Sequence, residues 1–215
     1  NINLPTKKAG RFNIWGVNGI SSAADVAIAD SSLWEYRGDT YNYSEKHLLS
    51  IAGLTHNFLF KNNSSYITTT LAHSVASTKT IEDSLDYSYT SRLVNDSKYA
   101  YNTNTITTYF NHKFSARYIM RIGAIFTNQS FDLNVVDLNY DTGIREQQVD
   151  QTGDANRYQG YLQWKWRMTE NFDLNSGVHL MKLGINNDYS IEPRIGARWH
   201  VKENQVINAG FGLHS

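Results

Sequence analysis

One short motif in this sequence is typical of catalysis. Asp141-Thr142-Gly143 matches the signature of aspartic proteases. Those enzymes need two such carboxylates, which share one proton. The sequence has no second copy, because Gln151-Thr152-Gly153 lacks the acid. Asp-Thr-Gly is also common in turns between strands. We therefore predict a turn at this position and no catalytic residues.

The seven histidines raise the question of a metal site. His179, His200 and His214 fall on the same face of predicted strands. His200 and His214 are on the order of 30 Å apart, at about 3.3 Å per residue, and His179 lies two strands, or about 10 Å, from His214. Ligand atoms on one ion lie about 2 Å from it. The spacing predicts solvated histidines, no metal site and no cofactor.

Other site chemistries find little support. The acid-rich segments 137–141 and 150–154 offer carboxylates to calcium, which stays a weaker alternative because neither has the spacing of the twelve-residue calcium loop. The sequence contains neither a Gly-x-Ser-x-Gly elbow nor a phosphate-cradling glycine loop. A Ser-His-Asp triad is defined by geometry and stays open. We predict that the protein is not an enzyme.

The composition narrows the class of protein. The formal net charge is zero, which lacks the basic footprint of a nucleic-acid-binding protein. Without cysteine, disulfides and thiolate metal sites are impossible. No run of 18 apolar residues is present, so a transmembrane helix is excluded. A hydrophobic fraction of 40% still suits a barrel wall, which needs apolar residues only at every second position.

The elements that would position any site are strands. Residues 155–168 read A-N-R-Y-Q-G-Y-L-Q-W-K-W-R-M, with aromatic and aliphatic residues alternating with Arg, Gln and Lys. Successive side chains of a strand point to opposite faces, so this segment predicts one apolar and one charged face. Further strands are predicted at about 11–20, 46–60, 65–78, 99–114, 116–133, 171–184, 189–201 and 204–214. A short helix within Ser22–Tyr36 is the best helical candidate.

The predicted connections alternate in length. Short turns lie near 61–64, 114–116, 169–171 and 202–204, whereas 21–45, 79–98 and 134–154 are predicted as long loops, with 185–188 as a brief exception. Short turns at one end and long loops at the other are the layout of outer-membrane barrels. We predict an all-β, antiparallel transmembrane barrel wall of about nine to ten up-and-down strands, with residues 1–215 as a single segment.

The alternation assigns residues to the two sides of this wall. The predicted lipid-facing residues are Tyr118, Met120, Ile122, Phe126, Leu162, Trp164, Trp166, Leu174, Val178, Ile195, Trp199 and Phe211. The predicted lumen-facing residues are Arg121, Lys165, Arg167, Glu192, Arg194 and Arg198. Aromatic residues near the short turns are typical of an interfacial girdle. A soluble antiparallel sheet or sandwich is the alternative, but packing a second layer would bury these charged side chains.

Two segments resemble a known family. I-E-P-R-I-G-A-R-W-H-V-K-E-N-Q-V-I-N-A-G-F-G-L-H-S (191–215) resembles a barrel hairpin of TonB-dependent outer-membrane receptors of the Bacteroidota, and R-F-N-I-W-G-V-N-G-I-S-S (11–22) resembles an earlier barrel strand. The resemblance implies a barrel of 22 strands, an N-terminal plug domain and a TonB-box peptide. No segment here looks like plug or TonB box, so we expect an internal piece of such a barrel.

The resemblance also implies a function. It implies uptake of a scarce solute, such as a siderophore, haem, vitamin, peptide or glycan, across the cell outer membrane, with outer-membrane lipid, the receptor's own plug domain and TonB as partners. Loops on a rigid scaffold usually carry binding. Candidate ligand contacts are Tyr36, Tyr41, Tyr43, Tyr87, Tyr89 and Tyr140, with packing between loops as the favoured alternative. A stand-alone small barrel, either an enzyme or an adhesin, is the second hypothesis, and a soluble β-rich binding domain is the third.

Overall fold

The computed structural model describes residues 1–214. Its ten strands form one antiparallel sheet, and their order in the sheet is their order in the sequence. The strands are β1 (Ile2–Pro5), β2 (Arg11–Asp25), β3 (Tyr41–Leu59), β4 (Ser65–Leu85), β5 (Ser91–Lys113), β6 (Tyr118–Leu138), β7 (Arg145–Arg167), β8 (Phe172–Leu183), β9 (Tyr189–Lys202) and β10 (Gln205–Gly212). The predicted all-β, up-and-down architecture is therefore confirmed. β1 was not predicted.

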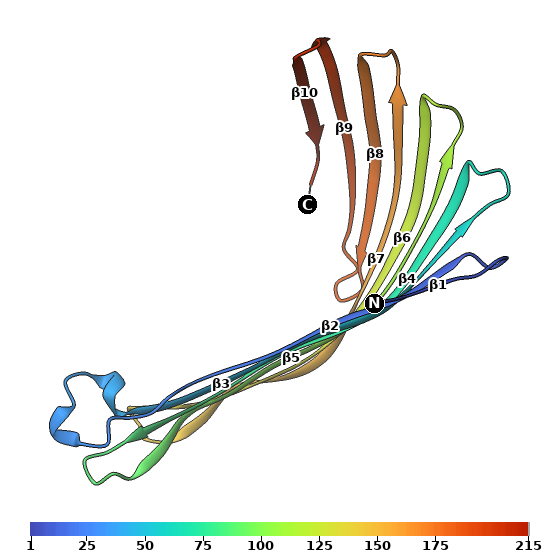
Figure 1. Ribbon diagram of the computed structural model, residues 1–215. Coiled ribbons are helices and arrows are strands. Elements are labelled where there is room, and N and C mark those ends of the chain that lie inside the picture. The colour runs from blue at the N-terminus through green and yellow to red at the C-terminus, as the bar shows by residue number, and fades with distance from the viewer. Residues whose placement is uncertain (215) are drawn as a thin grey trace.

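The sheet is bent and twisted, with two distinct ends (Figure 1). Tight turns join the strands at the turn end, near 60–64, 114–117 and 168–171, and the longer connections 26–40, 86–90 and 139–144 lie at the loop end. β5 and β7 each contain 23 residues, whereas β8 contains only 12. The loop-end parts of β2–β7 consequently project as a narrow arm beyond the shorter strands (Figure 1).

Two of the predicted long loops are wrong. Most of 79–98 belongs to β4 and β5, and most of 134–154 belongs to β6 and β7, so the true connections are 86–90 and 139–144. The paired strands continue because their backbone hydrogen bonds continue, as in the Lys79–Lys98 and Asn134–Asp150 pairs. The side chains there are polar on a face that is apolar elsewhere, which hid the strand pattern.

The predicted short helix within Ser22–Tyr36 is also wrong. Ser22–Asp25 continue β2 and pair with β3. The connection that follows contains only two 3-10 turns, η1 (Ser31–Leu33) and η2 (Arg37–Thr40). Small residues such as Ala23 and Ala24 accept either conformation, and cross-strand pairing decides the outcome. No helix within residues 1–214 has both the length and the apolarity to cross a membrane.

The two faces of the sheet differ in the half near the turn end. We name the face that carries Arg121, Tyr161 and Arg194 the cleft face, and the opposite face the back face. Cross-strand pairs place Ile122 beside Leu162 and Met120 beside Trp164 on the back face, and Arg121 beside Gln163 on the cleft face. Each predicted set of wall residues thus shares one face of the sheet.

Three aromatic side chains on the cleft face lie over glycines of adjacent strands. A Cβ atom added to Gly123 would lie 2.5 Å from the ring of Tyr161, and one added to Gly53 would lie 2.4 Å from the ring of Trp15. Phe131 covers Gly153 in the same way, at 2.8 Å. Such contacts protect the backbone at a residue without a side chain and fix the position of the ring.

The sheet forms a single layer with a small buried core. Among residues 1–214, the buried apolar side chains are Ala27, Val94, Val135 and Leu138. Large apolar side chains such as Ile122, Trp166 and Phe211 are exposed on the back face. Soluble monomers seldom expose contiguous apolar patches of more than a few hundred Å². This arrangement differs from the packed layers of a soluble sandwich.

Candidate functional site

A cleft lies on the cleft face near the turn end. It has a volume of about 860 Å³ and is lined by residues of β4 to β9. Arg121, Lys165 and Arg194 line it together with Tyr161 and His179. Of the predicted lumen-facing residues, three therefore come together in one concave site, where cationic, aromatic and amide side chains are available to a partner.

Glycines form part of the floor of the cleft. Gly177 of β8 and Gly196 of β9 line it directly. Gly196 pairs with Gly210 of β10, and Asn175 lies on the other side of Gly196. A position without a side chain lets another backbone approach closely. Gly177 and Gly196 therefore add no side chain to the cleft, and the Gln163 side chain packs close to Gly177.

The cations around the cleft are only partly neutralised. Lys165 lies 3.9 Å from Asp173, and Arg167 lies 3.3 Å from the same carboxylate. The guanidinium of Arg121 stacks over the ring of Tyr109, with 4.8 Å from its central carbon to the ring centroid. Among residues 1–214, no carboxylate lies within salt-bridge distance of Arg121 or Arg198. The cleft face consequently carries surplus positive charge.

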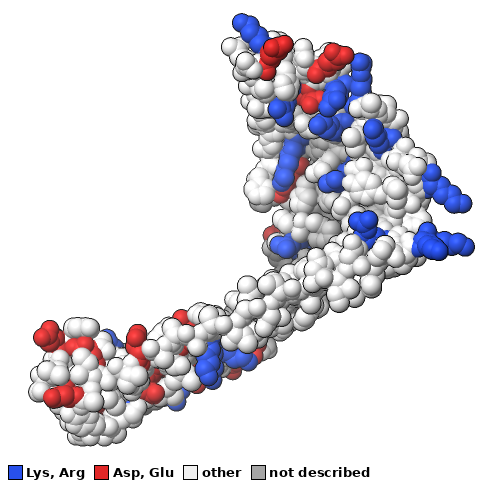
Figure 2. Space-filling view, viewed as in Figure 1, with Lys and Arg blue, Asp and Glu red and all other residues white. Residues whose placement is uncertain are grey.

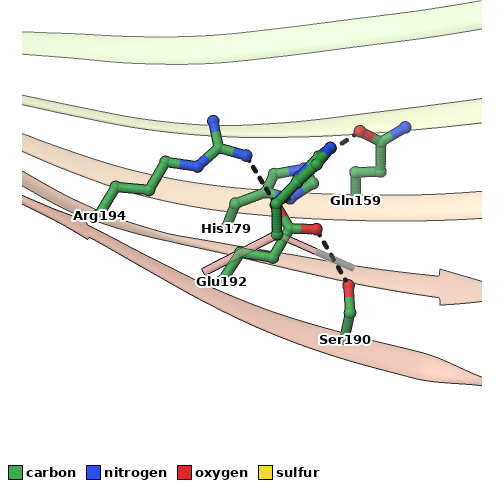
Figure 3. A network of polar contacts seen from close by, with 6 residues as sticks. Gln159, His179, Ser190, Glu192 and Arg194 are labelled. Atoms are coloured by element: carbon green, nitrogen blue, oxygen red, sulfur yellow. Dashed lines mark hydrogen bonds and ion pairs between the residues drawn. The ribbon is translucent and has the colours of Figure 1, made fainter. Parts of the chain in front are cut away.

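Glu192 and its neighbours form a polar network on the cleft face (Figure 3). Glu192 of β9 is only 2% exposed. Its Oε2 accepts a hydrogen bond of 2.6 Å from Arg194 and lies 3.3 Å from Nδ1 of His179 on β8 and 3.2 Å from Nδ1 of His214, which follows β10. Buried charges persist in proteins when they are paired. Three neighbouring segments thus hold one carboxylate.

This network corrects one sequence prediction and extends another. His179 is not a solvated side chain, because its Nε2 lies 3.1 Å from Oε1 of Gln159 and its other ring nitrogen faces Glu192. Glu192 does lie on the cleft face, but its burial was not predicted. Strand spacing separates the backbones of β8 and β10, whereas the side chains of His179 and His214 converge on the residue between them. Within residues 1–214, no group of three or more histidine and acidic side chains is arranged to hold a metal ion.

The loop end forms a second cluster, which contains most of the predicted tyrosines. Arg37 of η2 donates a hydrogen bond of 2.6 Å to the hydroxyl of Tyr41 and another to the hydroxyl of Tyr140. Its guanidinium lies 4.6 Å from the ring centroid of Tyr140. The two hydroxyls are 3.0 Å apart. Arg37 therefore ties the first connection to the connection between β6 and β7.

The same first connection also contacts the connection between β4 and β5. The ring of Trp34 lies 5.3 Å from that of Tyr87 and 6.2 Å from that of Tyr89. The hydroxyl of Tyr89 accepts a hydrogen bond of 3.1 Å from the backbone N–H of Ser31. Three loops that are distant in sequence thus form one tyrosine-rich surface.

Asp39 organises the first connection internally. It is 6% exposed, and its Oδ2 accepts hydrogen bonds from the backbone N–H groups of Glu35 and Tyr36, at 2.8 and 3.1 Å. Burial alone would raise the pKa of Asp39, but these two N–H groups and the Tyr36 hydroxyl lower it below the ordinary aspartate value. The Asp39 carboxylate in turn raises the pKa of Tyr36.

The structure places the predicted tyrosines in different surroundings. Tyr43 is not in a loop, because it lies within β3 and pairs with Asp25 and Glu82. Tyr41 is the first residue of the same strand. Its hydroxyl and those of Tyr89 and Tyr140 make hydrogen bonds to neighbouring connections, and the role of the tyrosines as ligand contacts stays a prediction. Tyr87 is 81% exposed. Asp141-Thr142-Gly143 is the predicted turn, since the Asn139 side chain accepts from the N–H groups of Asp141 and Thr142.

Charge is distributed unevenly between the two ends. Acidic side chains gather at the loop end, at the lower left of Figure 2, and basic side chains gather along the turn end at the right. Such a distribution is compatible with a formal net charge of zero, because each end has the opposite sign. A ligand that approaches either end meets a different potential.

The comparisons with known proteins support the fold. No family model matches the sequence, and no curated protein matches it. Among solved structures, the chain is similar to the TonB-dependent receptor FpvA of P. aeruginosa, solved in complex with a heterologous pyoverdine and iron. The TM-score is 0.63 at 13% sequence identity, over 93% of this chain and 32% of that receptor chain. The chain therefore has the fold of part of a receptor barrel wall and spans about a third of the receptor's length.

Proposed function

We propose that this chain is part of the barrel wall of a TonB-dependent outer-membrane receptor of the Bacteroidota type, which takes up a scarce solute. The likeness to a receptor barrel over 93% of the chain is the observation that carries this proposal. The two segments 11–22 and 191–215 resemble the same family. Neither the structural likeness nor these two segments identify the solute, which is a siderophore, haem, vitamin, peptide or glycan.

The chemistry of the two faces suits this role. The back face of β6 is apolar from Tyr118 to Phe126, which matches the roughly 9–11 residues of a tilted membrane-spanning strand. We assign this face to lipid. The cleft face, with Arg121 and Glu192, lines the lumen, where water or another protein segment solvates charge.

The remaining parts of the receptor follow from the same proposal. The ten strands belong to a larger barrel of 22 strands, a plug domain occupies its lumen, and TonB provides coupling to the inner membrane. The tyrosine-rich loop surface meets the solute outside the cell. There, Tyr36 and Tyr87 are the contacts we favour, because both rings are largely exposed, whereas Tyr41 and Tyr140 hold loops together.

The proposal is tested in cells that produce the protein. An antibody against residues 155–215 should detect the protein in the outer-membrane fraction. Deletion of its gene and deletion of the TonB gene should abolish growth on the same limiting solute. A band in the soluble fraction would overturn the membrane assignment. Growth that depends on this gene but not on TonB would favour the stand-alone barrel instead.

A further inference from the structure

We propose that the cleft receives an acidic, extended polypeptide segment. The inference rests on the proposed function, because that function places a second protein domain against the cleft face. The inference goes beyond the proposed function by naming the chemistry of the segment that Arg121, Lys165 and Arg194 in the cleft, and Arg198 beside it, recognise.

The first argument is the surplus of positive charge. Glu192 is fully committed to its neighbours, and Asp173 already lies within 4 Å of both Lys165 and Arg167. The guanidinium of Arg121 stacks over the ring of Tyr109, and neither Arg121 nor Arg198 makes an ion pair among residues 1–214. Covering this face with another protein layer would bury these cations, and buried cations are stable only when they are paired. Carboxylates on the covering layer would pair with these cations.

The second argument is the width of the cationic rim. Arg121, Gln163, Gly177 and Arg194 lie in one row of cross-strand pairs over β6, β7, β8 and β9. At about 4.8 Å per strand, Arg121 and Arg194 are about 14 Å apart. The guanidinium of Arg121 leans over Tyr109 of β5, away from β9, and that of Arg194 is held at Glu192. In this arrangement a single small anion does not bridge the two guanidinium groups. A chain with carboxylates on several residues can reach both.

The third argument is the floor between the cations. Gly177 and Gly196 line the cleft without side chains, and the amides of Gln163 and Asn175 offer donors and acceptors beside them. Backbone groups of an incoming segment need such partners, because an unpaired buried N–H or C=O is costly. The floor therefore fits a main chain, while the rim fits its acidic side chains.

Photo-crosslinking in the intact protein tests this inference. p-Benzoylphenylalanine is placed at Gln163, inside the cleft, in protein assembled in its own outer membrane. Gln151 is the matched control, because it is the same residue type on the same strand and face but outside the cleft. We expect position 163 to yield an adduct with a polypeptide whose linked peptide contains several Asp or Glu residues, and position 151 to yield no adduct with that peptide.

Charge reversal provides the second measurement. Arg121→Glu together with Lys165→Glu should lower the yield of that adduct by about tenfold or more, since attraction becomes repulsion. Arg145→Glu, on the arm, should leave it unchanged. Yields are compared only at equal outer-membrane levels. If the double variant does not assemble, the amino-acid composition of the peptide linked to position 163 tests the inference by itself. A peptide rich in Asp and Glu supports it, and a neutral or basic peptide contradicts it.

Four outcomes would overturn the inference. They are an adduct with a neutral or basic segment, an adduct with lipid alone, an adduct with a small anionic compound alone, and a yield that charge reversal does not change. Failure of the proposed function can be distinguished from failure of this inference. If solute uptake does not depend on the gene but the acidic adduct forms, the uptake proposal fails and this inference stands.

Discussion

The half of the sheet near the turn end and the half near the loop end distribute polar side chains differently over their two faces. Near the turn end, the back face carries Ile122 and Leu162, while the cleft face carries Arg121 and Gln163. Near the loop end, the back face carries Asn128 beside Asn156, with 3.0 Å between their side-chain amides. The cleft face there carries more apolar side chains, among polar ones such as Gln129 and Gln151.

The apolar side chains on the cleft face of the loop-end half come from several strands. Leu49 pairs with Ala76, Tyr101 with Phe131, and Val17 with Ile51. On the opposite face, Lys79 pairs directly with Lys98, and each lysine lies near an aspartate, Asp96 at 3.8 Å and Asp132 at 2.5 Å. Like charges directly across a sheet repel, so the two aspartates offset this repulsion.

The strand register does not change where the polarity of the two faces changes. β6 and β7 pair without a shift from Tyr118 to Val135, and the first bulge between them comes after Val135. The backbone therefore continues unaltered through the boundary between Phe126 and Asn128. The change of polarity is made by side-chain choice alone. Under the proposed function, this boundary marks where the back face leaves the hydrocarbon layer for water and headgroups.

The largest expected effect comes from charge on the back face of β6. Ile122→Arg should destabilise the membrane-embedded protein by about 2–4 kcal/mol if that position lies at mid-membrane, whereas Asn134→Arg should cost about 0–1 kcal/mol. Both residues lie on the same face of the same strand. The urea midpoint of unfolding in lipid vesicles, for protein extracted from the outer membrane, measures the difference. Equal losses of stability in the two variants would contradict a boundary between lipid and water on the back face between positions 122 and 134.

The next effect concerns buried charge on the cleft face near the turn end. Arg194→Ala removes the 2.6 Å partner of Glu192 and leaves a buried carboxylate less compensated. We expect a loss of roughly 1.5–3 kcal/mol of unfolding free energy. Arg198→Ala is the control, because Arg198 makes no ion pair among residues 1–214. Adding Glu192→Gln to Arg194→Ala should restore part of the loss, since the uncompensated charge disappears. If the unfolding free energy does not recover in the double variant, the buried charge of Glu192 is not the cause of the loss.

A smaller effect is expected at the loop end, where Asp39 orders the first connection. Asp39→Ala removes the acceptor of the Glu35 and Tyr36 N–H groups and should cost about 1 kcal/mol locally, as loss of a helix cap does. Hydrogen exchange of these two amides measures the loss. Asp30→Ala is the control, because Asp30 accepts from Ser32 and not from these amides. Faster exchange of the same amides in both variants would argue against a specific role of Asp39.

The same carboxylate gives the loop a defined pH dependence. The folded protein lowers the pKa of Asp39, so its contribution is present above the unfolded pKa and is lost as the pH falls through the folded value. Exchange protection of the two amides should be constant from pH 7 to about pH 5 and should decline below about pH 4. A decline that begins near pH 6 would point to another group.

The contrast between the two halves also explains what the sequence could predict. Near the turn end, aromatic and aliphatic residues alternate with charged residues, as in 155–168, and the strands there were predicted closely. Near the loop end, the back face is polar, so segments such as 91–98 and 134–138 resemble loops. Their strand structure depends on pairing with neighbouring strands, which a local pattern does not record.

The sites show the same dependence on neighbours. Alternation predicts which face carries Glu192, but its burial requires His179 of β8, Arg194 of β9 and His214 beyond β10. Likewise, the loop tyrosines were recognisable by residue type, whereas the contact of Arg37 with Tyr140 joins residues 103 positions apart. Such contacts follow from the order and length of strands and become visible only in the folded sheet.

The smallest effect should come from the ion pair of Lys98 and Asp132 on the back face of the loop-end half. The two charged groups are 2.5 Å apart, but both side chains are more than 40% exposed. Exposed pairs contribute about 0.2–1 kcal/mol, and at about 1 M salt the screening length falls to about 3 Å. A double-mutant cycle with Lys98→Ala and Asp132→Ala should therefore give a coupling below about 1 kcal/mol that disappears in high salt. A larger, salt-resistant coupling would mean that this surface is covered in the assembled protein, and the back face of the arm would then be an interface with another protein segment and not a surface exposed to water.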